Sequence, residues 1–312
     1  MAENDVIVEQ FRQLVRGSSD SLLAFLPPFA EAVTVEGTST LVRTHFLACD
    51  ENGIPAVESL AGAMASAALD FCIPRYKIEQ AFADYEKTRS TEAIVRLHEE
   101  ALDLFVRSEK SGEGGELLLF LLLERVLQRP QLLSKMALKT NSQVHVHGTD
   151  GIHANLEDDG VLELYWGESK LYQSSSEAFR DCIESIAPYL RPDGRESRKR
   201  DLLLVRDHLN ATQTELVSYL LEYFDEAKPK SLRVRWSGVC LVGFDHEHYP
   251  NIASLDEDEK KLLLRVLERW RQTVKKQVSR FEIVDVKIDL FCIPMPCVDD
   301  LRACVLKRMR VK

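Results

Sequence analysis

The 312-residue chain lacks the features of a membrane or secreted protein. Its longest apolar stretches, residues 117–123 and 239–244, are much shorter than the roughly 20 residues that a membrane-spanning helix needs. The first five residues include two acids, where a signal peptide has a basic segment followed by an apolar one. We therefore expect a protein without membrane segments, located in the cytoplasm.

Several motifs of common enzyme classes are also missing. The chain has no Gly-x-x-x-x-Gly-Lys-Ser/Thr loop, no Gly-x-Gly-x-x-Gly turn and no Gly-x-Ser-x-Gly elbow, which argues against ATP hydrolysis, dinucleotide redox chemistry and serine-hydrolase chemistry. Its seven cysteines form no Cys-x-x-Cys pair and lie in apolar segments, so they are interpreted as buried thiols. Only 25 residues are Gly or Pro, as in an ordinary globular protein.

The chain also has fewer basic than acidic residues. The chain has 50 acidic and 40 basic residues, which give a net charge of −10. This charge opposes non-specific attraction to the phosphate backbone of nucleic acids. Any role on nucleic acid must therefore use a local site or a partner.

The sequence predicts a change of structural class near residue 110. Residues 1–110 are expected to be a largely helical N-terminal region with one strand near 40–49, and the polar, glycine-rich run at 108–115 marks the boundary. Residues 111–312 are expected to form an α/β domain. An alternative is that the strand at 40–49 joins the main sheet, which would make this boundary artificial.

Within residues 111–312, strands are predicted by hydrophobic patterns at 141–171, 232–244 and 283–292. The first block contains the hairpin signal Asp-Asp-Gly at 158–160. A long helix between the last two strands is expected to begin at a capping box formed by Ser254 and Glu257. The fold class is thus mixed α/β, with a mixed sheet flanked by helices.

Three charged residues of the hairpin stand out as a candidate site. Glu168 and Lys170 are two positions apart on a strand, so their side chains leave the same face, and Asp150 is expected on the adjacent antiparallel strand. Two carboxylates at one point beside an apolar strand are costly unless a cation neutralises them. Hard oxygen ligands favour Mg²⁺ or Mn²⁺, which are commonly held by one or two carboxylates plus a substrate phosphate.

Asp150 followed by Glu168-Ser169-Lys170 resembles the motif of the PD-(D/E)XK nuclease superfamily, with Thr149 where the family name has proline. The resemblance implies a restriction-endonuclease-like core and a Mg-dependent nuclease. Asp150 and Glu168 would bind the metal, and Lys170 would position the attacking water. Members often add a glutamate from the preceding helix, and Glu116 stands at the matching position; its alternative role is favourable placement at a helix N-terminus.

The longer pattern of Gly-Glu-Leu at 115–117, Asp-Gly-Ile-His at 150–153 and Gly-Glu-Ser-Lys-Leu-Tyr at 167–172 resembles the HamA family, the effector nucleases of Hachiman anti-phage defence. This resemblance implies DNA as the substrate and a helicase partner, HamB, which restrains the nuclease until it senses aberrant DNA. The alternative is a non-catalytic DNA-binding or scaffolding subunit of a helicase complex.

Other residues near the motif are weaker candidates. His153 could contact the scissile phosphate or simply pack against the hairpin, and Lys135 and Lys139 could contact the DNA backbone or remain solvated. Glu113 and Glu124 are weaker alternatives to Glu116. Separately, His145 and His147 have a spacing that can bind zinc, although no further ligand follows at suitable spacing.

Overall fold

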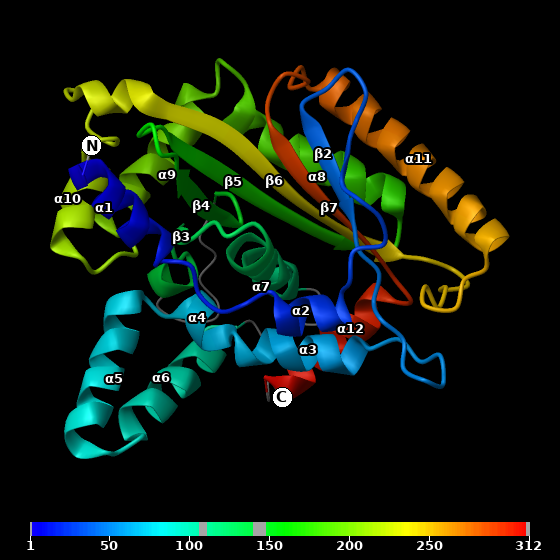
Figure 1. Cartoon of the computed structure of the whole chain (residues 1–312), viewed down its shortest axis with the longest axis horizontal. Coiled ribbons are helices and arrows are strands. Elements are labelled where there is room, and N and C mark those ends of the chain that lie inside the picture. Colours follow the sequence, from blue (N-terminus) through cyan, green and yellow to red (C-terminus); the bar gives the residue numbers. More distant parts are fainter. Residues whose placement is uncertain (1, 106–110, 140–147, 310–312) are drawn as a thin grey trace.

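The computed structural model describes residues 2–105, 111–139 and 148–309, and its centre is a seven-stranded sheet (Figure 1). The strands are β1 (Val33–Thr34), β2 (Thr40–Thr44), β3 (Gln131–Leu133), β4 (Gly151–Leu156), β5 (Leu162–Tyr172), β6 (Val234–Asp245) and β7 (Ile288–Met295). Their order is β1-β2-β7-β6-β5-β4-β3. β2, β7, β6 and β5 are parallel, whereas β1, β4 and β3 pair antiparallel. The expected mixed α/β fold is confirmed.

One face of the sheet is covered by α8 (Ser175–Leu190) and α11 (Glu257–Arg280). Phe179 and Ile183 of α8 and Val274 of α11 pack with Trp166 of β5 in one hydrophobic core. α1 (Ala2–Arg12), α9 (Arg195–Asp207) and α10 (Thr214–Leu221) complete this layer, and α1 packs on α10.

The other face is covered by α7 (Glu113–Leu121), which continues as a π-helix over Leu122–Val126. The same layer contains α2 (Asp20–Phe25), α3 (Val57–Ser66), α4 (Ala68–Cys72) and α12 (Val298–Arg308), and Leu117, Met64 and Leu301 share its core. α5 (Arg75–Thr88) and α6 (Glu92–Asp103) project together from this side (Figure 1). Short 3₁₀ turns lie at Met136–Leu138 and Pro229–Arg233. With both faces covered, β7 is buried along its whole length, as is usual for a central parallel strand.

Segments from both sides of the predicted boundary share this sheet. β2 pairs in parallel with β7, with Thr40 opposite Ile288 and Thr44 opposite Cys292. The strand expected near residues 40–49 therefore exists, although it ends at Thr44, and it joins the main sheet as the alternative interpretation had it. The division at residue 110 remains a prediction about domain organisation.

Two local predictions are wrong in detail. The capping box of α11 is formed by Asp256 and Glu259, not by Ser254 and Glu257, because Asp256 accepts hydrogen bonds from the Asp258 and Glu259 amides. The last strand was expected to begin at residue 283 but begins at Ile288. Val284 and Val286 lie in the turn region before it and pack against the core from there.

Candidate active site

Asp150 lies immediately before β4 and is fixed against β5. The hairpin is antiparallel with Gly151 opposite Gly167, as the sequence predicted, and the Asp150 amide donates to the Gly167 carbonyl at 2.9 Å. Oδ2 of Asp150 accepts hydrogen bonds from both the amide and the hydroxyl of Ser169, each at 2.7 Å. β5 continues past Gly167, the partner of Gly151, as far as Tyr172, and the Asp150 carboxylate lies beside this continuation at Ser169.

Glu168 and Lys170 form an ion pair on β5, with 2.6 Å between Lys170 Nζ and Glu168 Oε1. Glu168 is 6% exposed. Burial, followed by repulsion from Asp150, raises the pKa of Glu168 to about 7, although Lys170 opposes this shift. Burial opposes protonation of Lys170, but the charges of Glu168 and Asp150 raise its pKa, so the ammonium is retained at neutral pH. A buried carboxylate with a raised pKa is typical of functional sites.

Glu116, in the first turn of α7, lies within electrostatic range of Asp150. The helix approaches β5 closely, because a Cβ added at Gly115 would lie 3.0 Å from the Ser169 hydroxyl. Burial and then repulsion from Asp150 raise the pKa of Glu116 to about 8, whereas Lys135 lowers it. Asp150 therefore acts electrostatically on both Glu116 and Glu168. We call Glu116, Asp150 and Glu168 the carboxylate cluster.

The segment that carries Asp150 is held by α9, a contact that the sequence did not predict. Asp201 of α9 is 2% exposed and accepts a hydrogen bond from the Thr149 hydroxyl at 3.3 Å. Gly148 has a φ of +127°, and a Cβ there would lie 2.9 Å from Asp201 Oδ1 and 3.4 Å from Lys135 Nζ. Only glycine allows both the backbone conformation and this close approach.

The other predicted site residues have different surroundings. Lys139 pairs with Glu113, and both side chains are 7% exposed. His153 is 1% exposed, its Nδ1 lies 2.7 Å from the Arg129 carbonyl, and burial lowers its pKa to about 4. It also packs on Phe120, as the packing alternative describes, and its contact with substrate stays a prediction.

Glu124 belongs to a structural cluster rather than to the carboxylate cluster. It is completely buried and forms ion pairs with Arg16 at 3.1 Å and Arg75 at 3.5 Å. It also accepts a hydrogen bond from the Gln131 amide, so it joins α5, the N-terminal segment and β3 to the π-helix. His145 and His147, the residues with zinc-like spacing, lie outside the described residues.

The side chains around Asp150 differ from a preformed metal site in their arrangement but suit a divalent cation in their chemistry. Within residues 2–105, 111–139 and 148–309, no group of three or more His, Cys, Asp or Glu side chains is placed so that it could hold a metal ion. The chemistry of the carboxylate cluster nevertheless fits Mg²⁺ or Mn²⁺, because burial and then repulsion from Asp150 raise the pKa of both Glu116 and Glu168. A divalent cation would remove that repulsion, and carboxylate oxygens are the ligands it prefers.

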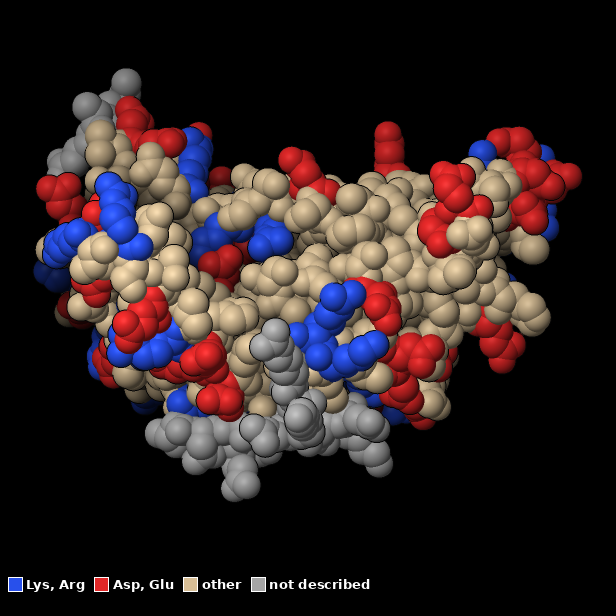
Figure 2. Space-filling model, turned by 90° about the horizontal axis from the view of Figure 1, so that it is seen from below, with Lys and Arg blue, Asp and Glu red and all other residues tan. Residues whose placement is uncertain are grey.

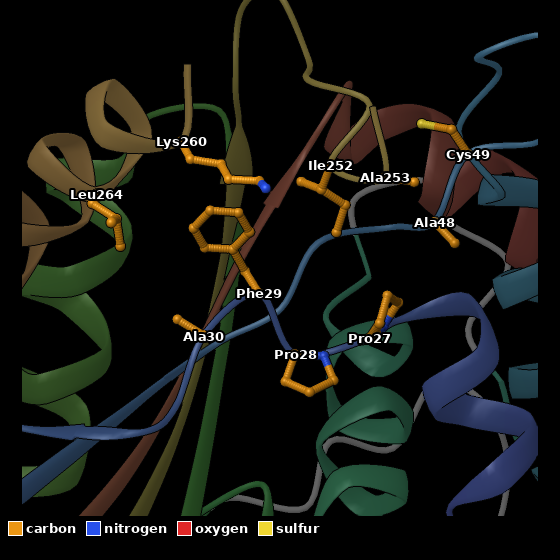
Figure 3. Close-up of a pocket in the computed structure, with 10 residues that line it drawn as sticks. All are labelled: Pro27, Pro28, Phe29, Ala30, Ala48, Cys49, Ile252, Ala253, Lys260 and Leu264. Atoms are coloured by element: carbon orange, nitrogen blue, oxygen red, sulfur yellow. The ribbon is translucent and has the colours of Figure 1, made fainter. Parts of the chain in front are cut away.

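A separate pocket of about 500 Å³ has a different character (Figure 3). Its walls are mainly apolar and include Pro28, Phe29, Ile252 and Leu264. The one cationic side chain lining it, Lys260, is paired with Glu257 at 3.1 Å. The pocket contains no member of the carboxylate cluster, so it does not suit phosphate chemistry.

The HamA family model matches residues 25–309, which include all seven strands of the sheet and all four charged residues of the predicted site. The chain belongs to the HamA family. Membership of HamA indicates a component of the Hachiman defence system. A search of curated proteins finds no match for this HamA chain. No helix in the described part of the chain combines the length and apolarity that crossing a bilayer requires.

Proposed function

We propose that the chain is a Mg²⁺- or Mn²⁺-dependent deoxyribonuclease with a PD-(D/E)XK active site, acting in the cytoplasm as the effector of a Hachiman complex. The observation that carries this proposal is the convergence of Asp150, Glu168 and Lys170 at one end of the β4–β5 hairpin, with Glu116 approaching from α7. Membership of the HamA family supports the same conclusion.

The proposed reaction is the hydrolysis of a phosphodiester. Asp150 and Glu168 would hold the cation, and Glu116 would complete the ligand set directly or through water. When bound, the cation polarises the phosphoryl group and lowers the pKa of a bound water. A water oxygen would form a bond to phosphorus while the bond from phosphorus to a sugar oxygen breaks. The water would release one proton to solvent, and the leaving sugar oxygen would take up one proton from solvent.

Lys170 has the clearest role among the residues of this chain. Its ammonium lies beside Glu168 and keeps its proton at neutral pH, so it can orient the attacking water and offset negative charge on the phosphoryl oxygens. The Ser169 hydrogen bonds fix the Asp150 carboxylate, which reduces the reorganisation needed when substrate arrives.

Delivery to DNA is proposed to depend on the helicase HamB, which would also restrain the nuclease. The chain carries a net charge of −10. On the side that carries α3, α5 and α12, the basic and acidic side chains of described residues are interspersed, and no continuous basic band crosses that face (Figure 2). Such a surface attracts DNA weakly, so a partner that binds DNA would supply most of the affinity.

The test is cleavage of plasmid and linear DNA by the purified chain in Mg²⁺ and in EDTA, alone and with the co-encoded helicase and ATP. Lys170→Met is compared with Lys261→Met. Lys261 is also two positions after a glutamate, Glu259, but it lies on α11 and pairs with Asp258. We expect Mg²⁺-dependent cleavage that Lys170→Met abolishes and Lys261→Met preserves.

The second candidate function is a non-catalytic DNA-binding or scaffolding subunit of the helicase complex. It is favoured by one observation: in the described part of the chain, no three potential ligands are arranged for a metal, and Glu168 is already paired with Lys170. Absence of cleavage from folded protein in every arm, with helicase binding intact, would support this function and refute the nuclease.

A further inference from the structure

Lys135 is a buried cation without a close anionic partner. It follows β3 and is 8% exposed. Among the described residues, it has no hydrogen bond, and no carboxylate oxygen lies within 4.0 Å of its ammonium. The neighbouring Lys139, by contrast, is paired with Glu113. Because most of this side chain is already buried while its ammonium has no paired anion among the described residues, a negatively charged ligand that met the ammonium would cause little further loss of water.

The surroundings of Lys135 connect it to the carboxylate cluster. Its ammonium lies 3.4 Å from the position that a Cβ would take at Gly148, two residues before Asp150. It also acts electrostatically on three carboxylates, because its charge lowers the pKa of Glu116, Glu168 and Asp201. Lys135 and Asp201 of α9 therefore both lie beside Gly148, and Lys135 is within electrostatic range of the carboxylate cluster.

The anion that fits this position is a phosphate. A carboxylate ligand would add to the charge of Glu116, Asp150 and Glu168, but a phosphodiester could share a divalent cation with them while a second oxygen meets Lys135. We propose that Lys135 binds a backbone phosphate of the nucleic acid beside the carboxylate cluster. The proposal rests on the nuclease function and names a binding residue for it.

The partly buried environment of Lys135 distinguishes it from surface lysines that contact DNA non-specifically. An exposed lysine contributes a screened, position-independent attraction. Lys135 instead has a fixed place, because Ser134 next to it donates to the Phe71 and Cys72 carbonyls of α4 at 2.9 and 3.2 Å. Its contact should therefore set the register of one phosphate relative to Asp150.

The test measures binding of a fluorescein-labelled single-stranded oligodeoxynucleotide in Ca²⁺, without turnover, over a series of salt concentrations. The chain is used alone and co-purified with the helicase. The variants are Lys135→Met, Lys135→Gln, Lys135→Arg and the control Lys261→Met, with circular dichroism to verify folding. Loss of one phosphate contact should weaken binding about tenfold and reduce the slope of log Kd against log salt by about 0.7 to 1.

We expect this loss for Lys135→Met and Lys135→Gln, partial retention for Lys135→Arg, and no change for Lys261→Met. Unchanged affinity and salt slope in both neutral variants would overturn the proposal, and so would absence of DNA binding by the wild-type chain in both preparations. If the neutral variants lose binding but the wild type never cleaves DNA, the phosphate site stands and the nuclease function fails. If the wild type cleaves DNA and the salt slope does not change in the neutral variants, the nuclease function stands and the phosphate site fails.

Discussion

β5 carries two buried glutamates, one in a structural cluster and one in the proposed active site, and their surroundings differ. Glu163, which is fully buried, accepts hydrogen bonds from Ser237 and Tyr165 at 2.6 Å each and from Lys287 at 3.0 Å. Burial alone would raise the pKa of Glu163, but these donors lower it below its usual value. Glu168 has one ion pair, faces Asp150 and has a raised pKa.

Burial alone does not distinguish a functional carboxylate from a structural one. Both side chains are removed from water, but only Glu163 is surrounded by enough donors to stabilise its charge. At Glu168 the chain leaves negative charge incompletely compensated, and the same is true of Glu116. This end of the sheet is therefore the one that a cation and a phosphate would stabilise.

The largest effect is expected from exchanging each glutamate for glutamine. Glu168→Gln should lower DNA cleavage on the order of 1,000-fold, because it removes a metal-binding charge, while the protein stays folded. Glu163→Gln should leave the cleavage rate per folded molecule unchanged but lower the free energy of unfolding by about 2–3 kcal/mol, because it leaves Lys287 and Ser237 poorly paired. Single-turnover cleavage and urea denaturation measure the two quantities. Equal losses of cleavage activity in Glu168→Gln and Glu163→Gln would show that the two glutamates do not differ in function.

A smaller effect is expected from Gly148→Ala at the chemical end of the sheet. The positive φ and the 2.9 Å approach to Asp201 Oδ1 should together lower the free energy of unfolding by about 2–3 kcal/mol and displace Asp150, which reduces cleavage. Gly53→Ala is the matched control. Gly53 has a φ of +77° but no atom within 4 Å of the added Cβ, so it reports backbone strain alone. Gly148→Ala should therefore lower the melting temperature more than Gly53→Ala does. Identical melting temperatures would show that the Asp201 contact does not affect stability.

At the structural end, Lys287→Met should lower the free energy of unfolding by about 1–2 kcal/mol, because Glu163 loses one donor but retains two. Cleavage should be unchanged. Lys276→Met on α11 is a suitable control for the general loss of a lysine, and equilibrium urea denaturation compares the two. If Lys287→Met altered cleavage while stability stayed constant, the two ends of the sheet would not be independent.

The smallest effect, and the one with a characteristic pH dependence, is expected for Glu116→Gln. The folded-state pKa of about 8 lies above the ordinary value of 4.5, so the folded protein binds the proton more tightly than the unfolded chain. Stability is therefore lost as pH rises from about 4.5 to 8. Glu116→Gln should match wild type near pH 4 and gain on the order of 1 kcal/mol at pH 8, after allowance for solvent screening of this half-buried group. Denaturation at the two pH values tests this sign, and a variant that is less stable at pH 8 would contradict it.

The local geometry of the hairpin could be predicted from the sequence, because it depends on strand alternation. Two residues that are two apart on a strand must share a face, and this rule places Glu168 and Lys170 together and Ser169 toward α7. The hairpin turn at 158–160 likewise follows from its residues. The first residue of α11 could not be predicted in the same way, because both Ser254-x-x-Glu257 and Asp256-x-x-Glu259 satisfy the capping pattern and the sequence does not choose between them.

Contacts between distant segments could not be predicted in this way. The pairing of β2 with β7 and the approach of Asp201 to Thr149 depend on how whole elements pack, and no local pattern encodes them. The pairing of Lys139 with Glu113 could not be predicted either, because Lys135 looks the same in the sequence and has no paired carboxylate among the described residues. Sequence thus indicated the chemistry of the site, while the environment of each charge required the three-dimensional fold.

The parallel pairing of β2 with β7 also bears on how the protein is made. During synthesis, β2 leaves the ribosome more than 200 residues before its partner, since the pair joins Thr40 to Ile288. Until Ile288–Met295 is available, β6 and β2 each present an edge on which other strands can add. Closing the sheet is therefore a late event of high contact order, which slows folding and leaves the nascent chain dependent on protection from aggregation.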